Sequence, residues 1–355
     1  MPTSHRNILL CVLDWGLGHA SRCVPLIRAL EAAGHQVTIA SSENALAFLR
    51  VACPDTPYHA LPSYGVRYPF KSMFWSMGWQ GPRILHTAWR ENQQVREIIE
   101  AQGIDLLISD GRFGCFHPDL HNIWLAHQLQ IQLDRPAMAD QLNGAYHAHL
   151  RRHFQEIWVP DWEGEHSLAG NLSAPVPGIP HRYLGALTRY LPRKTETAPN
   201  YHWLALLSGP EPQRSYFEEA LLRELKKQHQ PSLLVRGVSG STCIEEVQEG
   251  LFVVDWLHDE ELDDVVAQSR YLVCRSGYST LLDLSAWRKP ALFIPTPGQT
   301  EQIYLAHYWQ EKSWAFQQEQ EALDLCAGER VLMETPWALD YPEAEALVVD
   351  NYLTQ

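Results

Sequence analysis

A histidine follows two glycines near the start of the sequence, where an apolar run gives way to a helical pattern. In the stretch DWGLGHASR, Gly16 and Gly18 permit a tight turn that a ligand can approach closely. Ser21 replaces the third glycine of a dinucleotide-binding fingerprint, so the turn matches that motif only weakly. His19 stands where the turn becomes helix, and a neutral imidazole can accept a proton near neutral pH. His19 is therefore a candidate general base, while a helix residue that only hydrogen-bonds a neighbour fits this short pattern equally well.

A second glycine turn, CRSGYSTLLD, also lies between an apolar run and a helical pattern. It would present backbone N–H groups and hydroxyls at a helix start, an arrangement that suits a diphosphate. Its candidate ligand-binding residues are Ser276, Gly277, Tyr278, Ser279 and Thr280. Asp283 follows about one helical turn later, and a carboxylate beside an anion site suits a neutral partner such as a ribose cis-diol. A surface aspartate that stabilises the helix dipole is the alternative interpretation of Asp283.

The loop PTPGQTEQ follows the next apolar run, and its prolines and glycine fix the backbone before another helix. Its side chains are donors and acceptors of short reach, which suit sugar hydroxyls. The candidate residues in this loop are Gln299, Thr300, Glu301 and Gln302. A phosphate-binding turn, a ribose-binding acid and a sugar-binding loop therefore follow one another in the order of the parts of a nucleotide sugar.

Alternating apolar runs and amphipathic segments must position these turns. Strands separated by helical stretches pair in parallel, so the predicted fold is α/β, with two Rossmann-like doubly wound domains facing a cleft. In the first half we expect strands at 7–14, 35–42, 104–110 and 122–133, and a helix at 21–34. In the second half we expect strands at 202–208, 232–237, 251–257, 271–277 and 290–296, and helices at 213–228, 279–288 and 300–312.

A segment dense in Pro, Gly and Ser interrupts this alternation between residues 159 and 200. Its weak periodicity makes it the best candidate for a domain boundary. The predicted parts are an N-terminal domain at 1–160, a linker at 161–200, a C-terminal ligand-binding domain at 201–335 and a helical tail at 336–355. The tail is expected to be able to return to the N-terminal domain.

The composition excludes several classes of partner. The 355 residues carry a net charge of −14, and broad contact with nucleic acid would need clustered Lys and Arg instead. The seven cysteines include no Cys-x-x-Cys pair, which favours reduced thiols in the cytoplasm over disulfides or a zinc site. No window reaches the length of a membrane span. We therefore expect a cytoplasmic protein without nucleic acid partners.

The glycine turns and the loop that follows them resemble those of the GT-B glycosyltransferases, and within them family 28, typified by the N-acetylglucosaminyltransferase of peptidoglycan synthesis. The resemblance covers most of the chain and is strongest at 252–316. It implies that His19 is the catalytic base and that Asp283 binds ribose. The resemblance further implies that the donor-binding residues are Gly16, Gly18, Ser208, Gly209, Trp256, Leu257, Arg275, Ser276, Gly277, Tyr278, Ser279, Thr280, Asp283, Gln299, Thr300, Glu301 and Gln302.

The implied activity is that of an inverting, metal-independent glycosyltransferase. It would move a hexose, with N-acetylglucosamine as one candidate, from a UDP-sugar to an unknown acceptor that is a glycan, a lipid-linked sugar or a small molecule. No cofactor is expected besides the UDP-sugar co-substrate, since the chain has no Asp-x-Asp motif and helix dipoles can stabilise the leaving diphosphate. A nucleotide-sugar hydrolase or epimerase, or a non-catalytic nucleotide-sugar sensor, are the alternatives.

Three further features allow more than one interpretation. Asp110 and Arg112 follow a predicted strand and either line the acceptor side of the cleft or form a loop salt bridge; Asp110 is the second candidate catalytic residue. The closely spaced histidines at 117, 121, 147, 149 and 153 lack a partner at zinc-binding spacing, so we expect no metal site. The aromatic segment from Phe70 to Trp89 is an acceptor groove, a peripheral membrane contact or a helical hairpin of the core.

Overall fold

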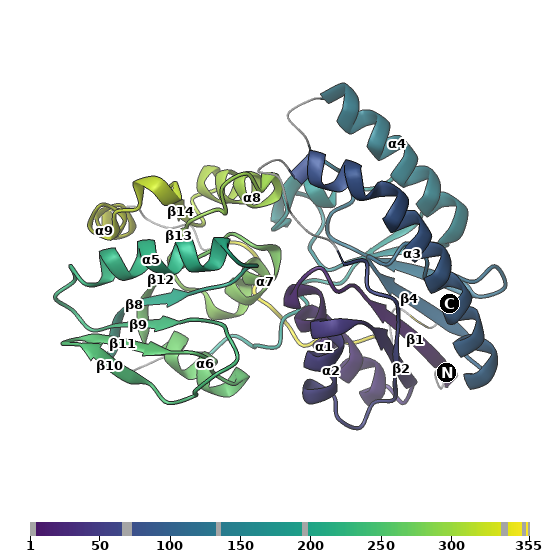
Figure 1. Cartoon of the computed structure of the whole chain (residues 1–355), viewed down its shortest axis with the longest axis horizontal. Helices are drawn as coiled ribbons and strands as arrows, with labels where there is room; N and C mark the ends of the chain where they lie inside the picture. Colours follow the sequence, from purple (N-terminus) through teal and green to yellow (C-terminus); the bar gives the residue numbers. More distant parts are fainter. Residues whose placement is uncertain are drawn as a thin grey trace. The chain divides into compact units, whose positions relative to one another are not determined.

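The computed structural model describes residues 5–65, 73–132, 136–193, 198–334, 340–349 and 353, with side chains from residue 81 onward in the helix that begins at Met73 (Figure 1). The chain divides into two compact units. The first comprises Met1–Arg189 together with Ala346–Gln355, and the second comprises Tyr190–Glu345. Each unit contains its own sheet and its own hydrophobic core.

The sheet of the first unit has seven strands among the described residues, all parallel, in the order β3-β2-β1-β4-β5-β6-β7. Its strands are β1 Asn7–Val12, β2 Gln36–Ser41, β3 Tyr58–Ala60, β4 Leu106–Asp110, β5 His121–Leu125, β6 Glu156–Val159 and β7 His181–Tyr183. Its helices are α1 Leu17–Ala32, α2 Glu43–Ala52, α3 Met73–Gln102 and α4 Pro136–His153, with short 3-10 turns at Gly164–His166 and Gly170–Ser173. The sheet places the carboxyl ends of β1, β4 and β5 side by side.

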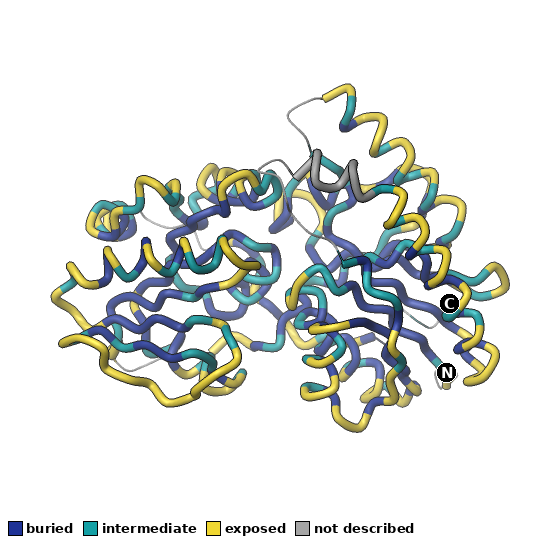
Figure 2. Tube along the Cα trace, viewed as in Figure 1, coloured by how far each residue is buried: buried dark blue, intermediate teal, exposed yellow. Residues whose placement is uncertain are grey.

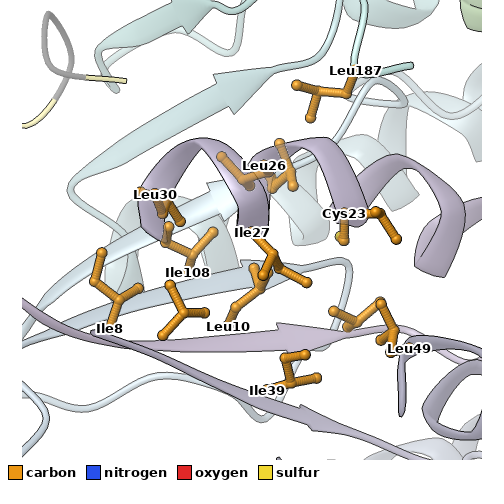
Figure 3. Packing of buried hydrophobic residues seen from close by; sticks show 14 of the residues in the cluster. Ile8, Leu10, Cys23, Leu26, Ile27, Leu30, Ile39, Leu49, Ile108 and Leu187 are labelled. Atoms are coloured by element: carbon orange, nitrogen blue, oxygen red, sulfur yellow. The ribbon is translucent and has the colours of Figure 1, made fainter. Parts of the chain in front are cut away.

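Both faces of this sheet are buried, as the near-continuous apolar runs of its strands require. Figure 3 shows Ile8 and Leu10 of β1 packed with Ile27 and Leu30 of α1 on one face. The intervening residues of β1 pack with α3 on the opposite face. Because successive side chains of a strand point to opposite faces, one strand supplies both cores.

The sheet of the second unit also has seven strands within the described part of the chain, in the order β10-β11-β9-β8-β12-β13-β14. Its strands are β8 Tyr201–Leu206, β9 Ser232–Val235, β10 Glu245–Gln248, β11 Leu251–Val254, β12 Ser269–Cys274, β13 Ala291–Phe293 and β14 Phe316–Gln317. Its helices are α5 Gln213–Leu225, α6 Asp259–Ala267, α7 Tyr278–Trp287, α8 Thr300–Glu311 and α9 Leu325–Glu334, with a 3-10 turn at Gln320–Ala322. The edge strand β10 is antiparallel to β11, and the other pairs are parallel.

The expected linker at 161–200 is wrong for most of its length, because β7 and two 3-10 turns within it belong to the first unit, which extends to Arg189. One buried carboxylate organises this apolar-poor segment. Asp161 accepts hydrogen bonds from the backbone N–H groups of Leu168 at 2.7 Å and Ala169 at 3.1 Å, and from the hydroxyls of Ser167 and Ser173. Because a buried polar group organises this segment, its apolar residues do not recur at a regular spacing. The sequence pattern therefore resembles that of a linker.

The end of the chain contributes to the first unit. Val349 is 2% exposed within the core cluster of that unit, and Leu347 and Leu353 pack against the same cluster. Figure 2 shows the central strands of both sheets as buried and the outer faces of the helices as exposed, whereas the edge strand β10 is exposed. Within the described residues, no helix has the length and apolar character needed to cross a bilayer.

Candidate active site

The first glycine turn connects β1 to α1. Gly16 is the N-cap of α1 and has a φ of 124°, a backbone conformation that side chains disfavour. Gly18 and His19 therefore lie in the first turn of the helix, where the backbone N–H groups have no partner within the helix. The side chain of His19 is 23% exposed, so it is reachable from solvent.

The two residues predicted to be catalytic lie in contact. Nδ1 of His19 is 2.9 Å from Oδ2 of Asp110, although 91 residues separate them in the sequence. Asp110 ends β4, and β4 pairs directly with β1, so the sheet brings the carboxylate beside the start of α1. Both residues were predicted from the sequence as candidate catalytic residues. Their contact could not be predicted, because it depends on the strand order.

Two further side chains complete this cluster, and the sequence reasoning missed both. Arg22 donates to Oδ1 of Asp110 through Nε at 3.1 Å and also through Nη2. Nη2 of Arg22 is 2.8 Å from Nδ1 of His19, and Nη1 is 2.9 Å from Nδ1 of His127. Arg22 lies three residues after His19 on the same face of the helix, and this spacing could have predicted their contact. His127 lay inside the expected strand 122–133, but β5 ends at Leu125.

The electrostatics of the cluster favour an ionised carboxylate. Burial alone would raise the pKa of Asp110, but the charge of Arg22, followed by contact with His19, outweighs burial and lowers the pKa to about 2. The neighbouring thiol of Cys23 has its pKa raised by burial and by the charge of Asp110. At neutral pH, Asp110 is therefore a hydrogen-bond acceptor for its neighbours.

Gly111 gives the ring of His19 its room. This glycine follows β4 with a φ of 73°. A Cβ at this position would lie 3.1 Å from Cδ2 of Leu13 and 3.5 Å from Cε1 of His19. Both the backbone conformation and the close approach therefore favour glycine beside the imidazole.

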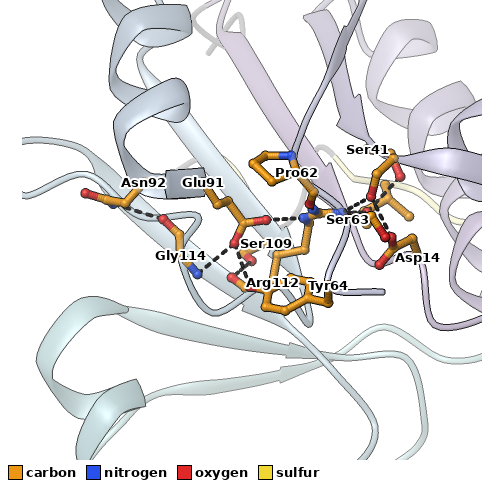
Figure 4. Close-up of polar contacts among 12 residues, drawn as sticks. Asp14, Ser41, Pro62, Ser63, Tyr64, Glu91, Asn92, Ser109, Arg112 and Gly114 are labelled. Atoms are coloured by element: carbon orange, nitrogen blue, oxygen red, sulfur yellow. Dashed lines mark hydrogen bonds and ion pairs between the residues drawn. The ribbon is translucent and has the colours of Figure 1, made fainter. Parts of the chain in front are cut away.

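Arg112 does not line a surface but lies fully buried in a polar network (Figure 4). It forms an ion pair with Glu91 of α3 and donates to the carbonyl oxygens of Val12 at 3.0 Å and Pro62 at 2.6 Å. It also donates to Oγ of Ser42 at 3.0 Å. Arg112 thus forms a buried ion pair with a helix residue and not a loop salt bridge, whereas Asp110 belongs to the histidine cluster.

Glu91 ties α3 to the segment that follows β4. It accepts hydrogen bonds from the hydroxyl of Tyr64 at 2.7 Å and from the backbone N–H of Gly114 at 2.9 Å. A Cβ at Gly114 would lie 2.1 Å from the carbonyl oxygen of Ala88, so no other residue fits there without movement. The network fixes the backbone around the histidine cluster from the opposite face of the sheet.

The predicted donor-binding residues of the second unit all follow the carboxyl ends of strands β8, β11, β12 and β13, which run parallel in one sheet. Ser208 and Gly209 follow β8 and are exposed, whereas Trp256 and Leu257 follow β11 and are more buried. The other residues follow β12 and β13, which are Arg275, Ser276, Gly277, Tyr278, Ser279, Thr280, Asp283, Gln299, Thr300, Glu301 and Gln302. The carboxyl edge of a parallel sheet is where such folds bind ligands.

Arg275 does not lie where the predicted contact with the donor would require it to be. It is 1% exposed, and it donates to the carbonyl oxygens of Ile294 at 2.8 Å and Gln213 at 3.2 Å, and to Oε1 of Gln320 at 2.7 Å. Its guanidinium also lies 3.9 Å from the ring centroid of Phe217. Arg275 therefore joins several segments beneath the edge and presents no surface to a ligand.

Ser276 and Gln302 join the second glycine turn to the loop that the sequence predicts to bind the sugar. Oγ of Ser276 donates to the backbone carbonyl of Gln302 at 2.7 Å, and Oε1 of Gln302 accepts from the N–H of Thr296 at 2.8 Å. Both residues are buried. Asp283 and Glu301 are half-buried, so they remain accessible from solvent.

Gly277 marks the open part of this edge. It is the N-cap of α7, and its φ of −73° is accessible to any residue. A Cβ built at Gly277 would meet no atom within 4 Å. The positive end of the α7 dipole therefore faces space at this position, as an anion site requires.

The described residues contain no group of three or more His, Cys, Asp or Glu side chains placed to hold a metal ion. His147 is within hydrogen-bond distance of the carbonyl oxygen of Leu129, at 2.8 Å. His149 and His153 pack against Phe116, and burial lowers the pKa of His149 to about 4. These histidines are therefore engaged in packing.

The aromatic segment predicted as a groove, a membrane contact or a core hairpin lies mostly outside the described side chains, which exclude Phe70, Phe74, Trp75 and Trp79. Its last member, Trp89 of α3, is 61% exposed. The core alternative therefore does not hold for Trp89.

No protein-family model matches the chain, and neither does any curated protein. Solved structures do match it. The glycotransferase of kitacinnamycin superposes with a TM-score of 0.68 at 15% identity, covering 95% of this chain and 93% of that one. SnogD of Streptomyces nogalater, a glycosyltransferase, gives 0.64 at 18% identity, covering 95% and 93%. The spinosyn rhamnosyltransferase SpnG complexed with thymidine diphosphate gives 0.65 at 12% identity, covering 95% and 94%. The chain has the fold of these glycosyltransferases, the GT-B fold with two Rossmann-like domains.

Proposed function

We propose that the chain is an inverting, metal-independent glycosyltransferase that moves a hexose, with N-acetylglucosamine as one candidate, from a UDP-sugar to an acceptor hydroxyl. The observation that carries this proposal is the contact between His19 and the buried carboxylate of Asp110. A histidine held by an ionised carboxylate is an arrangement suited to a general base. The glycosyltransferase structures that share the fold support the choice of reaction.

In the proposed reaction, Nε2 of His19 takes the proton of the acceptor hydroxyl while Asp110 holds Nδ1. The acceptor oxygen attacks the anomeric carbon, and the bond from that carbon to the diphosphate oxygen breaks. The electron pair leaves with UDP. The N-terminus of α7 at Gly277 stabilises the charge that develops on the diphosphate.

The donor is proposed to bind along the carboxyl edge of the second sheet. Trp256 and Leu257 would contact the base, Asp283 the ribose, and Glu301 with Gln302 the sugar. The glycosyltransferases SpnG and VinC were both solved with thymidine diphosphate (dTDP), and this nucleotide lacks the ribose 2′-hydroxyl. A carboxylate that binds a cis-diol should discriminate between the two nucleotide classes, so Asp283 is the basis for proposing UDP.

Two alternatives use the same donor site. The first is a hydrolase or epimerase of nucleotide sugars, and the second is a sensor that binds without turnover. A panel of UDP- and TDP-sugars tests all three, with nucleotide release measured in the presence and absence of cell extract. Release that depends on extract supports the transferase, release without extract supports the hydrolase, and tight binding without release supports the sensor. An epimerase would convert the donor sugar without releasing nucleotide, which chromatography of the sugar detects.

The remaining parts of the proposal concern the setting of the reaction. We place the protein in the cytoplasm, because its seven cysteines are all unpaired and five of them are buried. Exposed Trp89 and Leu85, one helical turn apart on α3, are the basis for keeping a lipid-linked acceptor or a peripheral membrane contact among the candidates. Sedimentation with anionic and neutral vesicles tests that contact.

A further inference from the structure

The contacts of His19 contain a conflict of hydrogen-bonding roles. Nδ1 of His19 lies 2.9 Å from Oδ2 of Asp110 and 2.8 Å from Nη2 of Arg22. An ionised carboxylate only accepts hydrogen bonds, and a guanidinium only donates them. One ring nitrogen cannot donate to Asp110 and accept from Arg22 at the same time. The two charged neighbours therefore compete for Nδ1.

The charges around the imidazole are nearly balanced before it takes a proton. Arg22 is 4% exposed and Asp110 is fully buried, so water screens their interaction weakly. Nδ1 of His127 must accept from Nη1 of Arg22, which leaves that ring uncharged. Within the described part of the chain, the electrostatic neighbours of this pair also include Cys23, which contacts Asp110, and Tyr146 of α4. Burial raises the pKa of both, so neither adds a charge at neutral pH.

From this geometry we infer that Arg22 is a positioning residue that keeps His19 uncharged and thereby extends its use as a base to lower pH. If Nδ1 carries the hydrogen, a second proton on Nε2 places a second cation beside one carboxylate. If Nδ1 accepts from Arg22, protonation of the ring breaks that hydrogen bond. Arg22 therefore opposes the imidazolium in either tautomer. The inference rests on the proposed function only in calling His19 the base.

The first test reads His19 directly and needs no enzymatic activity. The ring nitrogens of the full-length protein are labelled with ¹⁵N and followed by NMR from pH 5 to 9, and His19→Asn identifies the His19 signals. In Arg22→Gln, the midpoint of the His19 titration should move to higher pH by about one pH unit, since Asp110 is then unopposed. Arg28→Gln is the matched control, because Arg28 is exposed on the same helix. An equal midpoint in the wild type and Arg22→Gln overturns the inference.

A second variant separates the positive charge of Arg22 from the hydrogen-bond geometry of its guanidinium. Arg22→Lys keeps the positive charge but loses the fork that reaches Asp110 and both histidines. Its midpoint should stay within about 0.3 pH units of the wild type, and a rise as large as that expected for Arg22→Gln overturns the inference. If Arg22→Gln does not fold, as judged by circular dichroism, Arg22→Met replaces it as the uncharged variant, and an unmoved midpoint in Arg22→Met overturns the inference.

Kinetics then link the titration to turnover. If the wild type releases nucleotide from a sugar donor, the acid limb of its kcat/KM profile should move in Arg22→Gln with the NMR midpoint, while KM for the donor changes less than twofold. An NMR shift without any turnover in the wild type would leave the inference standing and remove the proposed function. If the NMR midpoint shifts but the acid limb of the kcat/KM profile does not, the role of Arg22 in controlling the protonation of the base is overturned.

Discussion

Val12 of β1 and Asp110 of β4 are direct partners in the parallel register of the first sheet. Because β1 leads into the glycine turn, this pairing sets the carboxylate beside the first turn of α1 and under His19. The partner of the proposed base is therefore positioned by backbone hydrogen bonds of the sheet and not by a loop. A site supported in this way is expected to keep its geometry when surface loops change.

Replacing His19 should separate catalysis from binding. In His19→Ala, single-turnover rates should fall by about a hundred- to ten-thousand-fold, because the acceptor hydroxyl loses its base. UDP affinity, measured by calorimetry, should change little because the predicted donor residues after β8, β11, β12 and β13 are untouched. Near-wild-type single-turnover rates would move the base to another residue.

Stability should fall in acid through Asp110. Its folded-state pKa is lowered from 3.8 to about 2, so the ionised form contributes about 2 kcal/mol that is fully present above pH 4. This contribution is lost as the pH falls from about 4 toward 2. Urea unfolding of the wild type and Asp110→Asn between pH 2 and 7 measures it. The difference between the two curves should shrink toward acid, and a constant difference would contradict the ion-pair account.

Asp283→Asn should weaken UDP binding by about 1 to 3 kcal/mol, because the variant loses a charged acceptor for the ribose hydroxyls. TDP binding should weaken less, since that nucleotide offers one hydroxyl fewer. Calorimetry with both nucleotides provides the comparison.

In the wild type, UDP should raise the melting temperature and NAD should not, and equal stabilisation by NAD would rule out the assigned donor site.

Gly277→Ala should fold normally and bind UDP about tenfold more weakly, because the added methyl group occupies the open space in front of α7. The backbone at Gly277 accepts alanine without strain. Gly144→Ala is the matched control, since Gly144 is also open and lies in α4. Equal UDP affinity in all three proteins would remove the anion site from the N-terminus of α7.

The buried pair of Glu91 and Arg112 should be costly to break. Arg112→Met leaves Glu91 buried without its partner, so unfolding free energy should fall by about 3 to 5 kcal/mol. Glu91→Leu combined with Arg112→Met should recover much of that loss. Arg193→Met, which removes the exposed ion pairs with Asp263 and Asp264, should change the free energy of unfolding far less in the same urea titration.

The local parts of this fold were predictable because their signals lie within a few residues. The helix expected at 279–288 is found at Tyr278–Trp287, and the helix expected at 300–312 at Thr300–Glu311. The strand expected at 122–133 extended too far, since apolar residues continue beyond the end of β5 at Leu125. An apolar run records burial, and burial does not end where pairing ends.

The side chains that surround His19 were harder to predict than the helices. Arg22 contacts His19, Asp110 and His127, which come from α1, β4 and the segment after β5. Only the strand order brings these elements together, and a single sequence does not state that order. For Arg275 the motif could be identified from the sequence, but the burial of the side chain could not. That burial depends on hydrogen bonds to carbonyl groups that are distant in the chain.

The burial of Val349 in the first core means that the polypeptide passes from the first unit to the second near Arg189 and passes back near Ala346. The ribosome therefore releases the last pieces of the first core only after the second unit has been synthesised. A fragment ending at Arg189 would contain every strand of the first sheet among the described residues and still have an incomplete core. Supplying residues 340–355 as a separate peptide should restore stability to such a fragment, and proteolysis with and without the peptide would measure it.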